Sequence, residues 1–80
     1  MGLFSRSPIQ DAQDEVKRCQ NTLAAMKANR DAAKKNGNYK SSAKNYRVGD
    51  KVGTVYDANV WTAEANLKRA KEKLAAAKKK

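Results

Sequence analysis

Apolar residues in two segments of this chain recur at alternating steps of three and four, and this spacing constrains the fold more than any other feature. Such a repeat places its members on one stripe of an α-helix, where they form the seam of a helix pair. We predict helix one over residues 8–36 and helix two over residues 58–78. The seam of helix one holds Ile9, Ala12, Val16, Cys19, Leu23, Met26 and Ala33, broken only by Arg30, and that of helix two holds Val60, Ala63, Leu67, Ala70, Leu74 and Ala77.

Helix one also carries strong start and stop signals. Ser7 can cap the helix, Pro8 suits its first position, and Gln10 stands where a capping box places Glu or Gln. Two lysines near the end of the segment complement the helix dipole, and Gly37 follows shortly after them. The sequence therefore predicts both ends of this helix.

The two seams predict an all-α fold, an antiparallel, coiled-coil-like two-helix hairpin. Residues 1–80 form a single domain with an N-terminal arm (1–7), a connector (37–57) and a frayed end (79–80). The favoured register sets Ile9 opposite Ala77. A register one heptad away also satisfies the period and brings Arg30 near Ala63 and Glu64.

The connector differs in kind from the helices, because it holds all three tyrosines and its apolar residues alternate. Tyr46, Val48 and Val52 fit a short β-hairpin, with Gly49-Asp50 as a tight type II′ turn. An irregular loop fits as well. A third alternative starts helix two near Asp50, since the valines and Tyr56 also suit a helical face.

A hairpin of this size has a thin core, because much of its apolar content is alanine. We therefore expect oligomerisation or docking into a larger assembly to complete it. The residues expected to bind a protein partner are Leu3, Phe4, Tyr46, Tyr56 and Trp61. For Trp61 the alternative is that it covers the connector and stacks with Arg30 or Tyr56.

The sequence argues against an enzyme. There is no histidine and one cysteine, which removes the common nucleophilic and zinc-binding sets, and no glycine-rich segment has phosphate-loop spacing. No catalytic residue, cofactor or metal ligand is expected. Without a signal peptide or bilayer-length segment, the chain is expected to be intracellular (cytoplasmic) or packaged in a virion.

A formal net charge of +10 points to a polyanionic partner. Because the last lysines are interleaved with a seam, they are expected on the outer face of helix two. The predicted polyanion-binding residues are Lys68, Arg69, Lys71, Lys73, Lys78, Lys79 and Lys80.

These features predict a small basic structural protein within a nucleoprotein or virion, in contact with nucleic acid or another polyanion without sequence preference. The alternative is a protein-binding adaptor or inhibitor that uses the Tyr/Trp-rich connector. A peripheral membrane protein, held by Leu3, Phe4, Arg6 and the lysines, is the least favoured hypothesis.

Overall fold

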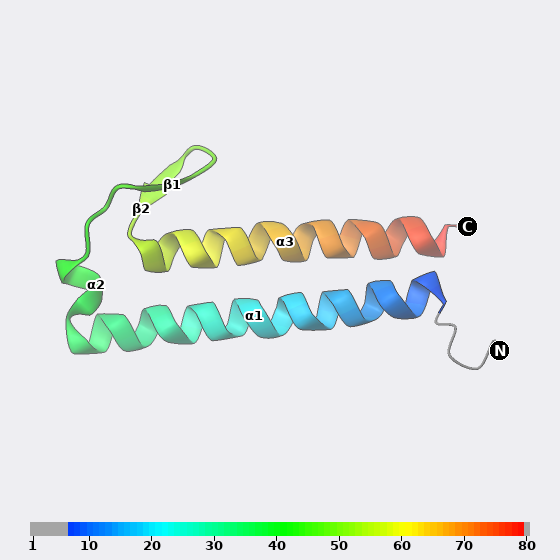
Figure 1. Cartoon of the computed structure of the whole chain (residues 1–80), viewed down its shortest axis with the longest axis horizontal. Helices are drawn as coiled ribbons and strands as arrows, with labels where there is room; N and C mark the ends of the chain where they lie inside the picture. Colours follow the sequence, from blue (N-terminus) through cyan, green and yellow to red (C-terminus); the bar gives the residue numbers. More distant parts are fainter. Residues whose placement is uncertain (1–6, 80) are drawn as a thin grey trace.

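Two long helices dominate the computed structural model, which describes residues 7–79. Helices α1 (Pro8–Asn36) and α3 (Val55–Lys78) run antiparallel and pack along their length, joined at one end by the connector (Figure 1). The molecule is elongated, with extents of 54 × 25 × 16 Å. The predicted two-helix hairpin is confirmed.

Capping contacts fix the predicted ends of α1. The Ser7 hydroxyl accepts a hydrogen bond from the Gln10 backbone N–H at 3.0 Å, and the Gln10 side chain accepts one from the Ser7 N–H at 3.3 Å. This reciprocal pair is a capping box, with Pro8 directly after Ser7. At the other end, Gly37 has a φ of 85°, a left-handed conformation that glycine adopts without strain.

Helix α3 begins at Val55, earlier than the predicted residue 58. The Thr54 hydroxyl accepts a hydrogen bond from the Asp57 N–H at 3.2 Å, and the Asp57 carboxylate accepts one from the Thr54 N–H at 3.3 Å. These contacts form a second capping box, with Asp57 in the place more often taken by Glu or Gln. The prediction started the helix too late because the alternation through Thr54 and Tyr56 resembled a strand.

The connector contains the β-hairpin that the alternation predicted. Strands β1 (Tyr46–Val48) and β2 (Lys51–Gly53) are antiparallel. Gly49 has a φ of 61°, whereas Asp50 keeps a negative φ, a combination that fits the predicted type II′ turn. The irregular loop and the helix starting near Asp50 are therefore both wrong. The paired residues are Tyr46 with Gly53, Arg47 with Val52, and Val48 with Lys51.

A short helix that the sequence did not predict, α2 (Asn38–Ser41), lies between α1 and the hairpin strands. The hydroxyls of Ser41 and Ser42 both donate to the Asn38 carbonyl, at 3.2 and 2.7 Å. This turn redirects the chain after α1 and carries Tyr39 to the start of α3, where its hydroxyl meets Asp57.

Only small side chains are fully buried between α1 and α3. The larger seam residues are half-buried, and Ile9 remains 36% exposed. A pair of helices leaves one side of each seam open to solvent, so only small side chains at the helix contact are fully covered. The buried apolar residues are Ala12, Val16, Ala33, Ala58, Val60, Ala63 and Ala70, and the half-buried ones on the seams include Cys19, Leu23, Met26, Leu67 and Leu74.

Among the described residues, two ion pairs between the helices show which register the hairpin adopts. Arg30 pairs with Asp57, and Glu15 pairs with Lys73. Both pairs lie close to the favoured register, in which Ile9 faces Ala77, and they are incompatible with the register shifted by one heptad.

Candidate functional site

The predicted polyanion-binding residues lie along the C-terminal half of α3. The six that the structure describes are all exposed, whereas Lys80 lies outside the described residues. Because the α3 seam packs on α1, these cations occupy the outer and flanking faces of the helix. The six are Lys68, Arg69, Lys71, Lys73, Lys78 and Lys79.

Antiparallel packing brings acidic residues close to these cations. The first turns of α1 are acidic, and the Nζ atom of Lys73 lies 3.8 Å from Oε1 of Glu15. On α3 itself, Glu64 and Glu72 stand four residues before and after Lys68, a spacing that places them on the same helix face. These carboxylates therefore offset part of the positive charge, and the net charge of this region is lower than the lysines at the end of the sequence alone indicate.

A second group of cations, which sequence reasoning did not select, lies in the connector. Asp50 is the only acidic residue between positions 38 and 54, against four basic ones. The prediction counted Asp57 in the connector, which lowered the connector's apparent net charge. With Asp57 assigned to α3, the local charge count would have identified this group. The connector cations, all exposed, are Lys40, Lys44, Arg47 and Lys51.

The side chain of Asp57 organises a polar cluster where the connector meets α3. Its Oδ2 accepts a hydrogen bond from the Tyr39 hydroxyl at 2.7 Å and others from the backbone N–H and hydroxyl of Thr54, both at 3.3 Å. Its Oδ1 lies 3.4 Å from NH1 of Arg30. We call Arg30, Tyr39, Thr54 and Asp57 the Asp57 cluster; it ties α1, α2 and α3 together.

Arg30 explains the interruption in the apolar repeat of α1. It stands at a seam position, half-buried, and points its charge toward Asp57 across the helix pair. Its Nε atom is buried with no hydrogen-bond partner among the described residues. The break in the seam was the only sequence signal for this cluster. The prediction paired Arg30 with Trp61, whereas its partner in the structure is Asp57.

The contacts of Asp57 shift two pKa values in opposite directions. Burial of Asp57 opposes its ionisation, but hydrogen bonds from Tyr39, Thr54 and Arg30 outweigh burial and lower the pKa of its carboxyl below the ordinary 3.8. The hydrogen bond to Asp57 raises the pKa of the Tyr39 hydroxyl above 10.0, because a phenolate would face a carboxylate. Between these values Asp57 is ionised and Tyr39 remains a donor.

The aromatic residues predicted to bind a partner have different surroundings. Tyr46 is 48% exposed, beside Arg47 and opposite Gly53 on the hairpin. Tyr56 is half-buried and its ring centroid lies 6.4 Å from that of Tyr39. Trp61 is half-buried as well, so Tyr46 is the most accessible of the predicted aromatic residues that the structure describes.

Trp61 packs against the connector. The Nζ atom of Lys51 lies 5.5 Å from the Trp61 ring, and a Cβ atom added to Gly53 would come within 2.9 Å of Cη2 of Trp61. The residue therefore covers the connector, as one alternative predicted, but it does so through Lys51 and Gly53. The predicted stacking partners were Arg30 and Tyr56.

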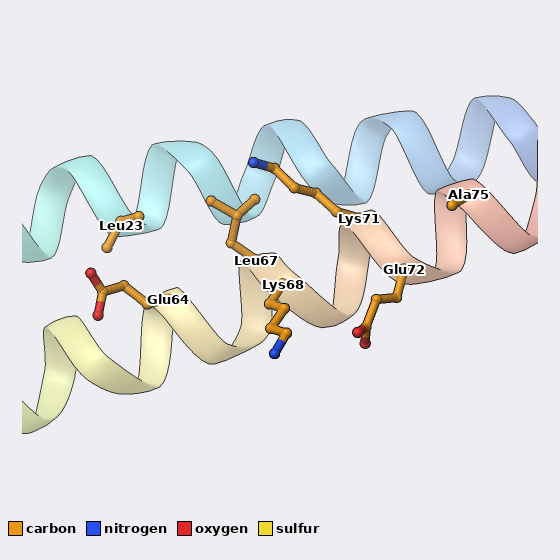
Figure 2. A pocket seen from close by; sticks show the side chains of 7 residues that line it. All are labelled: Leu23, Glu64, Leu67, Lys68, Lys71, Glu72 and Ala75. Atoms are coloured by element: carbon orange, nitrogen blue, oxygen red, sulfur yellow. The ribbon is translucent and has the colours of Figure 1, made fainter. Parts of the chain in front are cut away.

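A groove of about 450 Å³ runs along one flank of the helix pair, and we call it the Leu67 groove. Figure 2 shows Leu67 and Lys71 directed from α3 toward α1, with Leu23 approaching from α1, whereas Lys68 and Glu72 point away from α1. Its lining combines the half-buried leucines with charged residues. The lining residues are Leu23, Glu64, Leu67, Lys68, Lys71, Glu72 and Ala75.

Two of the predicted partner-binding residues, Leu3 and Phe4, lie outside the described part of the chain. Across residues 7–79, no group of three or more Cys, Asp or Glu side chains is placed to hold a metal ion. In that same part of the chain, neither long helix has an apolar stretch that could cross a membrane.

Comparisons with known proteins add no family to this picture. No family model matches the chain, and no curated protein and no solved structure gives a significant match. The functional argument therefore rests on the chain's own residues.

Proposed function

We propose that this chain is a small basic structural protein that packs into a larger assembly, a nucleoprotein or virion component. In this role it contacts nucleic acid or another polyanion without sequence preference. It acts as a binding and packing element rather than an enzyme, without a cofactor, inside a cell or a virion.

The observation that carries the proposal is the incomplete burial of the seam. Four large apolar side chains of the seams, those of Leu23, Met26, Leu67 and Leu74, each stay half-buried in the isolated hairpin. Covering them with another protein surface would remove further apolar area from water, which is the main favourable term in protein association. Packing into an assembly is therefore the role that best uses this surface.

The distribution of cations supports the polyanion contact. Exposed lysines and arginines lie at both ends of the elongated molecule, along the second half of α3 and on the connector. Cations distributed in this way can neutralise the evenly spaced phosphates of a nucleic-acid backbone, and this requires no motif that recognises base edges. A contact of this kind is sensitive to salt and tolerant of sequence.

A salt series with a random-sequence DNA duplex and a single strand tests this proposal, with the mass of the complex followed by light scattering. We expect affinity to fall steeply with salt, because bound cations release counterions from the phosphates. Arg69→Glu combined with Lys79→Glu should weaken binding and reduce the slope of log affinity against log salt by about two. Neither residue lines the Leu67 groove.

The matched control reverses two exposed lysines of α1, Lys17 and Lys27, and so changes the net charge by the same amount. If the control weakens binding as much as the α3 variant, net charge rather than the α3 surface attracts the polyanion. An absence of binding at low salt would contradict the polyanion contact altogether.

A second candidate function, a protein-binding adaptor or inhibitor, is favoured by one specific observation. Tyr46 and Val52 on the β-hairpin are 48% and 56% exposed, and large exposed apolar side chains suit a partner surface. Tyr56 and Trp61 contribute less to this candidate, because both already pack within the chain. Failure of nucleic-acid binding at low salt would make this function the better one.

A further inference from the structure

One face of the β-hairpin combines two aromatic rings with a cation. Residues paired across two strands project from the same face, and side chains two apart along a strand do so as well, so Tyr46 shares a face with Lys51. The ring of Trp61 borders this face, because a Cβ atom added to Gly53, the residue opposite Tyr46, would come within 2.9 Å of it. The Nζ atom of Lys51 lies 5.5 Å from the centre of the Trp61 ring. We call Tyr46, Lys51 and Trp61 the β-hairpin face.

Tyr46 is the accessible ring of the β-hairpin face. It is 48% exposed, more than any other aromatic residue at positions 7–79. Tyr39 and Tyr56, in contrast, pack against each other at the start of α3. The β-hairpin lies on the side of α3 away from α1, so the packing of the two long helices does not cover it (Figure 1). A planar ligand can therefore reach the Tyr46 ring without displacing any part of the fold.

The surroundings of this ring are positively charged. Arg47 follows Tyr46 directly in β1, and the connector cations outnumber the acidic residues between positions 38 and 54 by four to one. That acidic residue, Asp50, lies in the turn of the β-hairpin. Asp57 is close to Gly53 but is buried and already bound to Tyr39, Thr54 and Arg30. The exposed charge around Tyr46 is therefore mainly cationic.

We propose that the β-hairpin face binds an unpaired strand of nucleic acid. Tyr46 stacks on one base, and the connector cations neutralise the phosphates on either side of it. An aromatic ring for the bases together with cations for the backbone is the combination by which proteins hold single strands without sequence preference. This inference rests on the proposed function, the contact with a polyanion, and it names the class of polyanion and a contact beyond the lysines of α3.

The chemistry of the β-hairpin face favours an unpaired strand over two other occupants. A duplex would satisfy the cations equally well, but its bases stack on one another and offer no free face to Tyr46. A protein partner could cover the ring, but lysine is depleted at protein interfaces, and three of the four connector cations are lysines. Only an unpaired strand uses both the ring and the cations.

A pair of variants at one position tests the stacking. Tyr46→Phe keeps the ring, whereas Tyr46→Val removes it but keeps an apolar residue that suits a strand. Binding of a short labelled single strand and of a duplex of the same sequence is followed by fluorescence anisotropy at low salt. We expect Tyr46→Val to weaken binding of the single strand by at least about fivefold, the low end of what one stacked base contributes. Tyr46→Phe should retain that affinity, and neither variant should change binding of the duplex.

A second pair of variants tests the cations of the connector. Arg47→Gln should weaken binding of the single strand and reduce the slope of log affinity against log salt by about 0.7, the value for one phosphate contact on a single strand. Its matched control is Arg18→Gln, which removes the same charge from an exposed position on α1. The control should leave the slope nearly unchanged, because Arg18 lies on the other long helix.

Trp61 supplies a readout that does not depend on affinity. It is the only tryptophan of the chain and lies at the edge of the β-hairpin face, so its emission reports binding there. Addition of the unlabelled single strand to the wild type should quench this emission. Binding along the second half of α3 alone should leave the emission nearly constant.

Three results would overturn the inference: equal affinity of Tyr46→Val and Tyr46→Phe for the single strand, equal losses of Tyr46→Val on the single strand and the duplex, or constant Trp61 emission when the strand is bound. Each of them leaves the polyanion contact of α3 intact. An absence of binding to either nucleic acid at low salt would contradict the inference and the polyanion contact together. The exposed Tyr46 ring would then support the protein-binding function.

Discussion

The two ends of the hairpin are held together by different means. At the connector end, Asp57 accepts hydrogen bonds from Tyr39 and Thr54 and pairs with Arg30, and Thr54 and Val60 are almost completely buried. At the open end, the inter-helix ion pair joins the exposed side chain of Lys73 to that of Glu15, which is 39% exposed. One end is tied by a partly buried polar cluster and the other by a surface contact.

This difference shows how a chain with little apolar volume can still specify one arrangement. Polar groups removed from water must find their partners, so the Asp57 cluster tolerates few alternative positions of α1, α2 and α3. An exposed ion pair is screened by water and salt and specifies little. The connector end should therefore set the register, whereas the open end follows it.

Asp57→Asn should produce the largest loss of stability, because it removes the charge at the centre of the connector-end cluster. The amide keeps the shape of the carboxylate but leaves Arg30 without its counter-charge and weakens the hydrogen bonds from Tyr39 and Thr54. We expect the free energy of unfolding to fall by about 2–3 kcal/mol, measured by urea denaturation followed by circular dichroism. A loss below about 1 kcal/mol would mean that the cluster does not hold the connector end.

The stability difference between the wild type and Asp57→Asn should depend on pH in a defined way. The folded pKa of Asp57 is lowered, so its contribution is present above 3.8 and is lost as the pH falls further and the carboxylate is protonated. The folded pKa of Tyr39 is raised, so its contribution is full below 10.0 and is lost as the pH rises further.

Thermal unfolding of both proteins from acid to alkaline pH measures this dependence. The gap between their melting temperatures should be widest at intermediate pH and should narrow toward both extremes, while titration of the other carboxyls and lysines affects both proteins alike. A gap that stays constant with pH would contradict the assignment of the charged state to Asp57.

Glu15→Gln makes the same chemical change at the open end and should have the smallest effect. Because Lys73 is exposed and Glu15 remains accessible to solvent, we expect the free energy of unfolding to change by less than about 0.5 kcal/mol. High salt should remove even this difference, as seen by urea denaturation at two ionic strengths. An effect as large as that of Asp57→Asn would show that the two ends are equivalent and would break the comparison.

Much of the hairpin could be predicted from local sequence rules. The three-four repeat identified both helices, and Ser7, Gln10 and Gly37 marked the ends of α1 correctly. The start of α3 was placed too late because a Thr54–Asp57 capping box overlaps residues whose alternation also fits a strand. Helix α2 escaped prediction because four residues carry too little periodicity to detect.

The candidate site could be predicted only as a set of residue types. The excess of lysine in the second half of α3 predicted exposed cations, and the six that are described are exposed. The neighbours of those cations could not be predicted, because Glu15 reaches Lys73 only through antiparallel packing. For the same reason, Arg30 was recognised as a break in the seam while its partner Asp57 was not.

The sequence by itself determined that two helices form and that their seams face one another, because helix periodicity, capping and charge are local properties of the chain. Only the tertiary structure decided the register, the cluster around Asp57 and the Leu67 groove. Each of these features depends on residues that are far apart in sequence. The packing of the two seams determines which of those residues lie close together in space. In seams whose fully buried residues are all alanine or valine, that choice depends on a few polar contacts between the helices, and the apolar repeat does not encode those contacts.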